Sequence, residues 1–197
     1  MELVKFAPKS RVKELLRKYP AARFYDTSLH AAYASDFPQV KNASEFCPFV
    51  PYGNIPVPKM DCASDSVEGI WQGLKIIRGK IAPAYFHGKG RKRYGKPRGH
   101  QFGKKVLGYV AARKKIFVPA YEFMFYNCVP EESIRRILGF ARDDVKQFFF
   151  DVDENGDIGN RKSPLAHSAV LVDIINRELS SGDSLRRYRC EAKPARR

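Results

Sequence analysis

Glu68, Gln72 and Lys75 are polar residues whose spacing would place them on one face of a helix. At 100° per residue the three side chains fall within about 60° of one another, and Trp71 borders them. A carboxylate, an amide and an ammonium are thus aligned beside an aromatic ring. Such a stripe is either the solvated edge of a helix or a reactive site at the edge of a cleft, and spacing alone leaves both open.

A second group of carboxylates lies in the segment 151–158, DVDENGDI, which matches the first eight positions of an EF-hand calcium loop. The twelfth position of that loop requires a glutamate, and Lys162 stands there instead. The preceding phenylalanines, 148–150, indicate a strand where an EF-hand has a helix. We therefore interpret the segment as a turn on Asn155-Gly156, the pair favoured in type I′ turns.

The positive charge of the chain is concentrated in one stretch. The 197 residues contain 36 Lys and Arg against 21 Asp and Glu, a formal net charge of +15. Residues 69–121 hold nine Lys and five Arg and no acidic residue, so the remainder is close to neutral. A field of this sign attracts phosphate groups. A solvated basic face that aids solubility is the alternative, but the neutral remainder favours a phosphate-bearing partner.

The cysteines, Cys47, Cys62, Cys128 and Cys190, form no C-x-x-C pair and no zinc-like spacing with the four histidines. We read them as reduced thiols. The N-terminus does not resemble a signal peptide, and no apolar run reaches 18 residues. We therefore expect a cytoplasmic protein with no membrane partner, no metal and no cofactor.

Periodicity and end signals predict four helices and two strands. The helices are expected from Ser10 to Tyr19, from Asp65 or Ser66 to about Ile77, from Pro130, and from Pro164 (capped by Ser163) to Leu179; the strands are expected at 23–26 and 146–152. The proline-rich segment 46–58 and the glycine- and lysine-rich segment 87–105 are expected to be loops.

The apolar content of 44% suits one domain with a real core. We expect an α+β fold: a predominantly helical single domain with a few short strands. Its parts are an N-terminal helix in 1–22, the main domain in 23–180 with the basic loop 87–105, and a basic tail in 181–197.

The segment 66–75, SVEGIWQGLK, resembles the S-E-H-x-x-Q-A-x-K helix of NADAR domains. Other features follow in the family's order: Phe24-Tyr25 upstream, a G-R element at 90–93, an acidic turn and a closing helix. The resemblance spans about residues 23–179 and implies a YbiA-like fold. Gly69 stands where the family has histidine, and the family's Trp-Gly after the acidic turn is absent.

The resemblance implies cleavage of an N-glycosidic bond between a ribose phosphate and a base. Such a bond breaks through an oxocarbenium-like transition state, which a nearby carboxylate stabilises or supplies with activated water. Glu68 is the expected catalytic carboxylate, with Asp151 or Asp153 as a second one in the cleft. The expected substrate-binding residues are Trp71, Gln72, Lys75, Arg91, Arg93 and Lys96.

Two other functions fit the same residues. The acid-free stretch is interleaved with aromatics such as Tyr94 and Tyr109, which is typical of non-enzymatic nucleic-acid-binding proteins. A scaffold that only binds ADP-ribose-like ligands is also compatible with Gly69. In every case the expected partner carries phosphate, as a nucleotide, ADP-ribose or nucleic acid does. No sequence pattern sets the oligomeric state.

Overall fold

The computed structural model of the chain describes residues 3–181, and the predicted basic tail lies outside them except for its first residue. The strands are β1 (Val4–Phe6), β2 (Arg23–Asp26), β3 (Val40–Asn42), β4 (Ile55–Pro56), β5 (Ala63–Ser64), β6 (Lys75–Ile76), β7 (Gly99–Phe102), β8 (Lys105–Leu107) and β9 (Gln147–Phe150). The helices are α1 (Val12–Lys18), α2 (Ala32–Asp36), α3 (Val67–Gly73), α4 (Tyr109–Ala112), α5 (Val118–Asn127), α6 (Glu131–Arg142) and α7 (His167–Ser181). Short helical segments are η1 (Lys9–Arg11), η2 (Ser44–Phe46), η3 (Pro83–Phe86) and the π-helical η4 (Arg113–Phe117).

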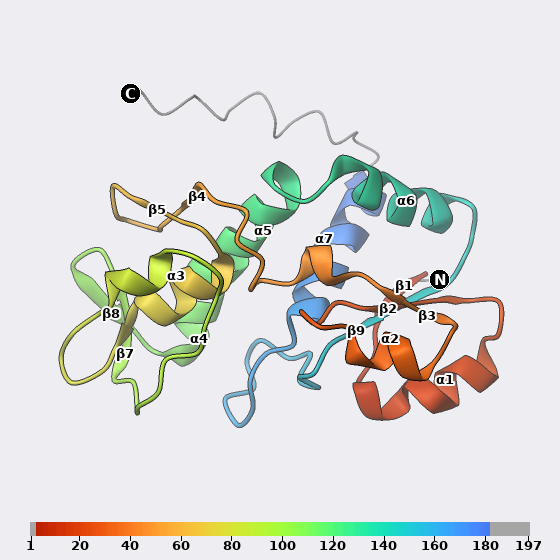
Figure 1. Cartoon of the computed structure of the whole chain (residues 1–197), viewed down its shortest axis with the longest axis horizontal. Helices are drawn as coiled ribbons and strands as arrows, with labels where there is room; N and C mark the ends of the chain where they lie inside the picture. The colour runs from red at the N-terminus through yellow and green to blue at the C-terminus, as the bar shows by residue number, and fades with distance from the viewer. Residues whose placement is uncertain (1–2, 182–197) are drawn as a thin grey trace.

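A four-stranded sheet with the spatial order β1-β9-β2-β3 forms one end of the molecule (Figure 1). Each pairing is parallel, and Phe24 of β2 lies opposite Phe148 of β9. The carboxyl ends of these strands therefore meet at one edge of the sheet.

Helices cover both faces of this sheet, which explains why the consecutive phenylalanines of β9 are all buried. Phe148 and Phe150 pack with Phe24 on the side of α1 and α2. Phe149 points the other way and stacks on Tyr25, with ring centroids 4.7 Å apart, on the side of α6 and α7. Successive phenylalanines of β9 thus pack against the helices on opposite faces of the sheet.

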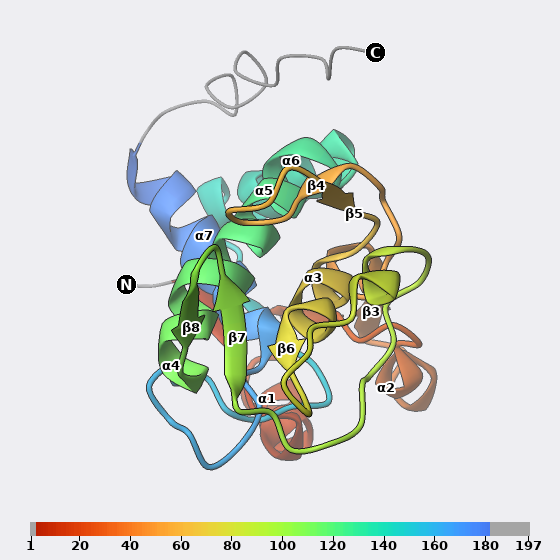
Figure 2. The same cartoon turned by 90° about the vertical axis from the view of Figure 1, so that its left-hand side faces the viewer.

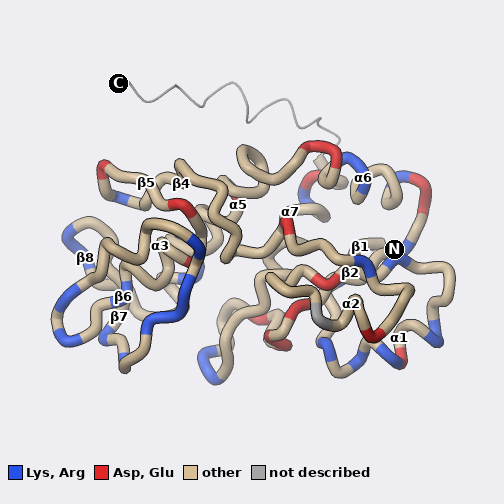
Figure 3. The backbone as a smooth tube through the Cα atoms, in the orientation of Figure 1, with Lys and Arg blue, Asp and Glu red and all other residues tan. Residues whose placement is uncertain are grey.

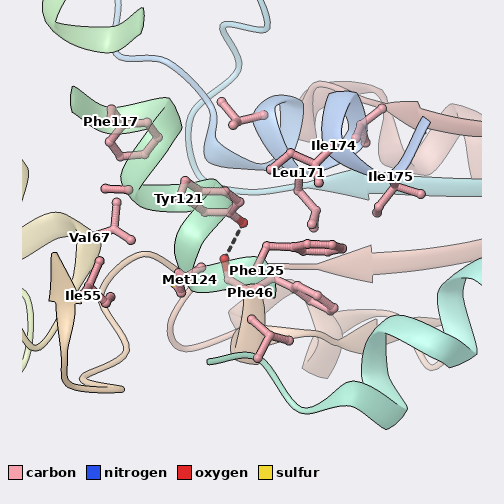
Figure 4. Close-up of a cluster of buried hydrophobic side chains, with 14 of the residues drawn as sticks. Phe46, Ile55, Val67, Phe117, Tyr121, Met124, Phe125, Leu171, Ile174 and Ile175 are labelled. Atoms are coloured by element: carbon pink, nitrogen blue, oxygen red, sulfur yellow. Dashed lines mark hydrogen bonds between the residues drawn. The ribbon is translucent and has the colours of Figure 1, made fainter. Parts of the chain in front are cut away.

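The other end of the molecule consists of α3, the β4–β5 pair, the antiparallel sheet β6-β7-β8 and the unbroken helical stretch α4–η4–α5 (Figures 1 and 2). The two ends share one core. Tyr121 of α5 is fully buried and donates a 2.6 Å hydrogen bond to the carbonyl of Phe46, among side chains from α3 and α7 (Figure 4). The described residues form a single α/β domain.

The N-terminal segment belongs to this domain. β1 pairs with β9 at the edge of the sheet, and Val12 and Leu15 of α1 pack against its face. Both predicted strands and all four predicted helices are present. The helices α2, α4 and α5 and the β7–β8 hairpin were not predicted, because their segments are short or carry no clean apolar period.

Several predicted boundaries were wrong. The helix from Ser66 ends at Gly73 and not at Ile77, because the chain turns there into β6, which pairs with β7. No side chain caps the first helix, and the backbone N–H of Ser10 donates to Glu154 instead. The predicted loop 87–105 contains β7 and begins β8, so the irregular part, which we call the rim loop, is 87–98.

The region before α7 also differs from the prediction. The last helix begins at His167, and the Ser163 carbonyl accepts a hydrogen bond from Arg113. The type I′ turn at Asn155-Gly156 was wrong, since neither residue has the positive φ that this turn requires. Asn155 instead forms a parallel bridge with Leu165.

Candidate functional site

A cavity of about 640 Å³ lies where the segments that follow β2 and β9 meet α3, the rim loop and η4. Ligands of open parallel sheets bind at this carboxyl edge of the strands. The lining side chains are Ser28, Leu29 and His30 after β2; Cys47, Pro48 and Phe49; Glu68, Trp71, Gln72 and Lys75; Lys92, Arg93 and Tyr94; Tyr109, Arg113 and Phe117; Val152 and Asp153; and Pro164, Leu165 and His167.

The helix α3 presents its polar side chains to this cavity and not to solvent. The Ser66 hydroxyl caps it by accepting a 3.0 Å hydrogen bond from the backbone N–H of Gly69. All residues of α3 are buried, including Glu68 and Gln72, which are 6% and 3% exposed. The interpretation as a solvated helix edge is therefore wrong.

Glu68 is held in a short polar chain. Gln72 Nε2 donates to Glu68 Oε1 at 2.6 Å, and Lys75 Nζ donates to Gln72 Oε1 at 2.7 Å. Burial raises the pKa of Glu68 to about 7, although the Gln72 hydrogen bond and the Lys75 charge both oppose the shift. At neutral pH this carboxyl group is poised between its acid and base forms.

Lys75 reaches this chain from a strand, not from the helix that the sequence predicted. The helix ends where Gly73 packs against Phe86, whose Cε1 would lie 2.2 Å from an added Cβ. Lys75 is half-buried in β6, and its pKa is lowered by burial, while Glu68 opposes that shift. Glu68, Gln72 and Lys75 lie together as predicted. Lys75 reaches the other two from β6, whereas the sequence predicted one continuous helix.

Two glycines permit the close packing around Glu68. An added Cβ at Gly69 would lie 2.7 Å from both Ser64 Oγ and the Tyr85 carbonyl oxygen. Position 69 therefore has no room for the histidine found in NADAR domains. An added Cβ at Gly90 would lie 2.9 Å from Glu68 Cβ, so the rim loop rests directly on the carboxylate's helix.

Of the two predicted partner carboxylates, Asp153 lines the cavity and Asp151 does not. Asp151 is 1% exposed and accepts hydrogen bonds from the backbone N–H of Asp153 at 2.6 Å and from Ser168 N and Oγ at 2.9 Å. It thereby caps α7 and fixes the backbone at Asp153. Burial, followed by the Asp151 charge, raises the pKa of Asp153.

His167 lines the cavity. The sequence placed it in the last helix but did not indicate it as a site residue. Its Nδ1 lies 3.1 Å from Asp151 Oδ2, and its Nε2 lies 2.9 Å from Thr27 Oγ1. Asp151 follows β9 and Thr27 follows β2, so the ring joins the ends of two neighbouring strands. The contact depends on residues 140 positions apart, which no local pattern indicates.

Of the predicted substrate-binding residues of the rim loop, Arg93 lines the cavity, whereas Arg91 and Lys96 do not. Arg93 donates to the carbonyls of Lys75 and Lys80 at 2.6 and 3.1 Å, so it fastens the loop to β6 while lining the cavity. Arg91 lies over the Tyr85 ring, 4.7 Å from its centroid, and neither Arg91 nor Lys96 lines the cavity.

Lys92 is the rim-loop cation that the predicted residue set omitted. It lines the cavity, and its charge lowers the pKa of both Glu68 and Asp153. A cation thus lies within electrostatic reach of both carboxylates. Its position in the run Arg91-Lys92-Arg93 was visible in the sequence, but nothing there showed that Lys92 and Arg93 line the cavity and Arg91 does not.

Aromatic rings form the apolar walls. Trp71 lines the cavity and packs against the buried His100 in a tilted arrangement, with ring centroids 3.9 Å apart. Arg113 is also buried in the wall, where its guanidinium lies over Tyr109 and donates to the carbonyls of Ile158 and Ser163. Arg113 therefore supports the loop after Asp153.

Within residues 3–181, no group of three or more His, Cys, Asp and Glu side chains is arranged to hold a metal ion. In the same part of the chain, no helix is long and apolar enough to cross a membrane.

No curated protein and no solved structure matches the chain. One family matches residues 7–171, a range that includes every residue lining the cavity. The chain belongs to this family of unknown function, DUF6939.

Proposed function

We propose that the cavity hydrolyses an N-glycosidic bond in a nucleotide or ADP-ribosyl substrate. The observation that carries the proposal is that Glu68 and Asp153 face one cavity from different segments, and burial raises both pKa values. A pair of carboxyl groups facing one cavity is the arrangement used to cleave glycosidic bonds.

The two carboxyl groups suit different roles. The pKa of Glu68, at about 7, leaves much of this group protonated at neutral pH, so it can give its proton to the leaving nitrogen of the base as the C1′–N bond breaks. Asp153 as a carboxylate stabilises the positive charge that develops on the sugar. A water oxygen then bonds to C1′ and passes one proton to Asp153. The products are the free base and a sugar with a C1′ hydroxyl.

The remaining walls suit the rest of such a substrate. Trp71 and Tyr109 offer apolar rings for a base or ribose. Lys75 is half-buried, and its ammonium group donates a hydrogen bond to the neutral Gln72. Lys92 lines the same cavity, and its charge acts on Lys75. Two such cations favour a bound anion, and phosphate is the anion that nucleotides supply.

The test is release of free base from a panel of nucleotides, ADP-ribose conjugates and ADP-ribosylated oligonucleotides, followed by chromatography. We expect Glu68→Gln and Asp153→Asn each to slow release by about 100-fold or more, while ligand binding persists. The kcat/KM of the wild type should fall as pH rises through about 7, because Glu68 then loses the proton that it donates.

Glu132→Gln provides the matched control, since it removes an exposed carboxylate from α6, outside the cavity. Its rate should equal that of the wild type. Full activity in Glu68→Gln would contradict the proposal. Binding of ADP-ribose without turnover of any compound in the panel would instead support a binding-only scaffold.

A further inference from the structure

The rim of the cavity carries an exposed tyrosine. Tyr94 is 92% exposed, and Val152, on the loop after β9, is 64% exposed. Both side chains line the mouth of the cavity, and only Val106 is a third exposed large hydrophobic residue among residues 3–181. An exposed aromatic ring at the edge of a cavity is available to stack on a base.

Cations flank this tyrosine along the rim loop. Lys92 and Arg93 precede it, and Lys96 and Arg98 follow it. Gly95, at φ +121°, turns the chain immediately after the tyrosine and packs against Ile77. An aromatic ring between cations offers one base a stacking surface and its phosphates a counter-charge.

The cations around the cavity outnumber its two carboxylates, Glu68 and Asp153. In the part of the chain that the structure describes, no ion pair involves any Lys or Arg of 69–121, and every such pair lies elsewhere. The exposed cations extend beyond the cavity over the rim loop and the β6-β7-β8 sheet (Figure 3). They are Arg78, Lys80, Lys89, Arg91, Lys92, Lys96, Arg98, Lys104 and Lys105.

One nucleotide cannot use this many charges. A cavity of about 640 Å³ accommodates a single nucleotide-sized group, so any further part of the ligand must lie on the rim. We infer that the substrate is part of a single-stranded nucleic acid: the reacting nucleotide enters the cavity, a neighbouring base stacks on Tyr94, and the phosphates lie along the rim-loop cations. This inference rests on the proposed function for the identity of the group in the cavity.

Fluorescence anisotropy with labelled single-stranded DNA and RNA of about 12 nucleotides tests the inference, with Glu68→Gln as the parent protein so that no turnover interferes. A single strand should bind tighter than the mononucleotide and tighter than the duplex of the same sequence. Tyr94→Ala should weaken strand binding about tenfold or more, and Tyr94→Phe should restore it. Lys92→Met should weaken binding and lower the salt dependence by about one phosphate contact.

Lys18→Met is the matched control, because it removes the same charge from α1, outside the cavity lining. Its binding should change far less than that of Lys92→Met. Strand binding no tighter than mononucleotide binding, or unaffected by Tyr94→Ala, would overturn the inference even if free nucleotides are hydrolysed. Tyr94-dependent strand binding without base release would uphold the binding surface and refute the proposed reaction.

Discussion

Glu68 acquires its chemistry from its surroundings. A glutamate on a helix is ordinarily solvated and ionised, but here α3 is enclosed by the Pro48–Phe49 segment and the rim loop. Burial moves the pKa to about 7, into the range of a general acid or base. The sequence identified this residue and its contact with Gln72 through helical spacing, whereas the burial that gives it this pKa comes from segments distant along the chain.

Gly69, next to Glu68, is closely packed against neighbouring segments. We expect Gly69→Ala to lower the free energy of unfolding by about 1–3 kcal/mol, because the new Cβ would lie 2.7 Å from the Tyr85 carbonyl oxygen. Gly139→Ala in α6 is the matched control, since nothing lies within 4 Å of its added Cβ. It should leave stability unchanged or raise it by up to about 1 kcal/mol.

Urea denaturation of both variants measures the difference. Equal stability of Gly69→Ala and the wild type would mean that the packing around α3 is looser than described, and that a side chain at position 69 is tolerated.

At the scale of elements, the sequence predicted those segments whose own pattern is strong. A helix begins at Ser66, one of the two expected starts, and the apolar run around Phe149 forms the buried central strand. The end of α3 was not predictable from helical periodicity, because it depends on the pairing of Lys75 with His100 across the β6–β7 sheet. The role of Asp151 was likewise not predictable from the sequence, because its carboxylate accepts hydrogen bonds from Ser168 at the start of α7.

Arg113 links the elements behind the second carboxylate. Its guanidinium donates to carbonyls at Ile158, Asn160 and Ser163, and its side chain is 1% exposed. We expect Arg113→Met to cost about 2–4 kcal/mol, because three carbonyls lose a charged donor. Backbone amides of 157–163 should also exchange faster with deuterated solvent.

Lys114→Met serves as the control, because it removes a neighbouring exposed cation of the same helical segment. It should alter neither stability nor exchange. Unchanged exchange of 157–163 in Arg113→Met would show that the loop is held by its own turn contacts.

At the scale of the whole molecule, the cavity is a product of topology. The parallel order β1-β9-β2-β3 brings the carboxyl end of a C-terminal strand beside that of an N-terminal one. Asp153 thereby reaches the cavity that α3 and the rim loop form from the other side. No sequence pattern predicted this juxtaposition.

Glu68, Asp153 and Lys92 act on one another electrostatically in a single cavity. Titration of ¹³C-labelled glutamate by NMR tests this interaction most directly, with the Glu68 signal assigned by its loss in Glu68→Gln. We predict that Glu68 titrates near 7, that Asp153→Asn lowers its pKa by removing a neighbouring negative charge, and that Lys92→Met raises it by removing a positive one. Titration of Glu68 near its ordinary value of 4.5, unchanged in both variants, would show that Glu68 is solvated and does not interact with Asp153 or Lys92.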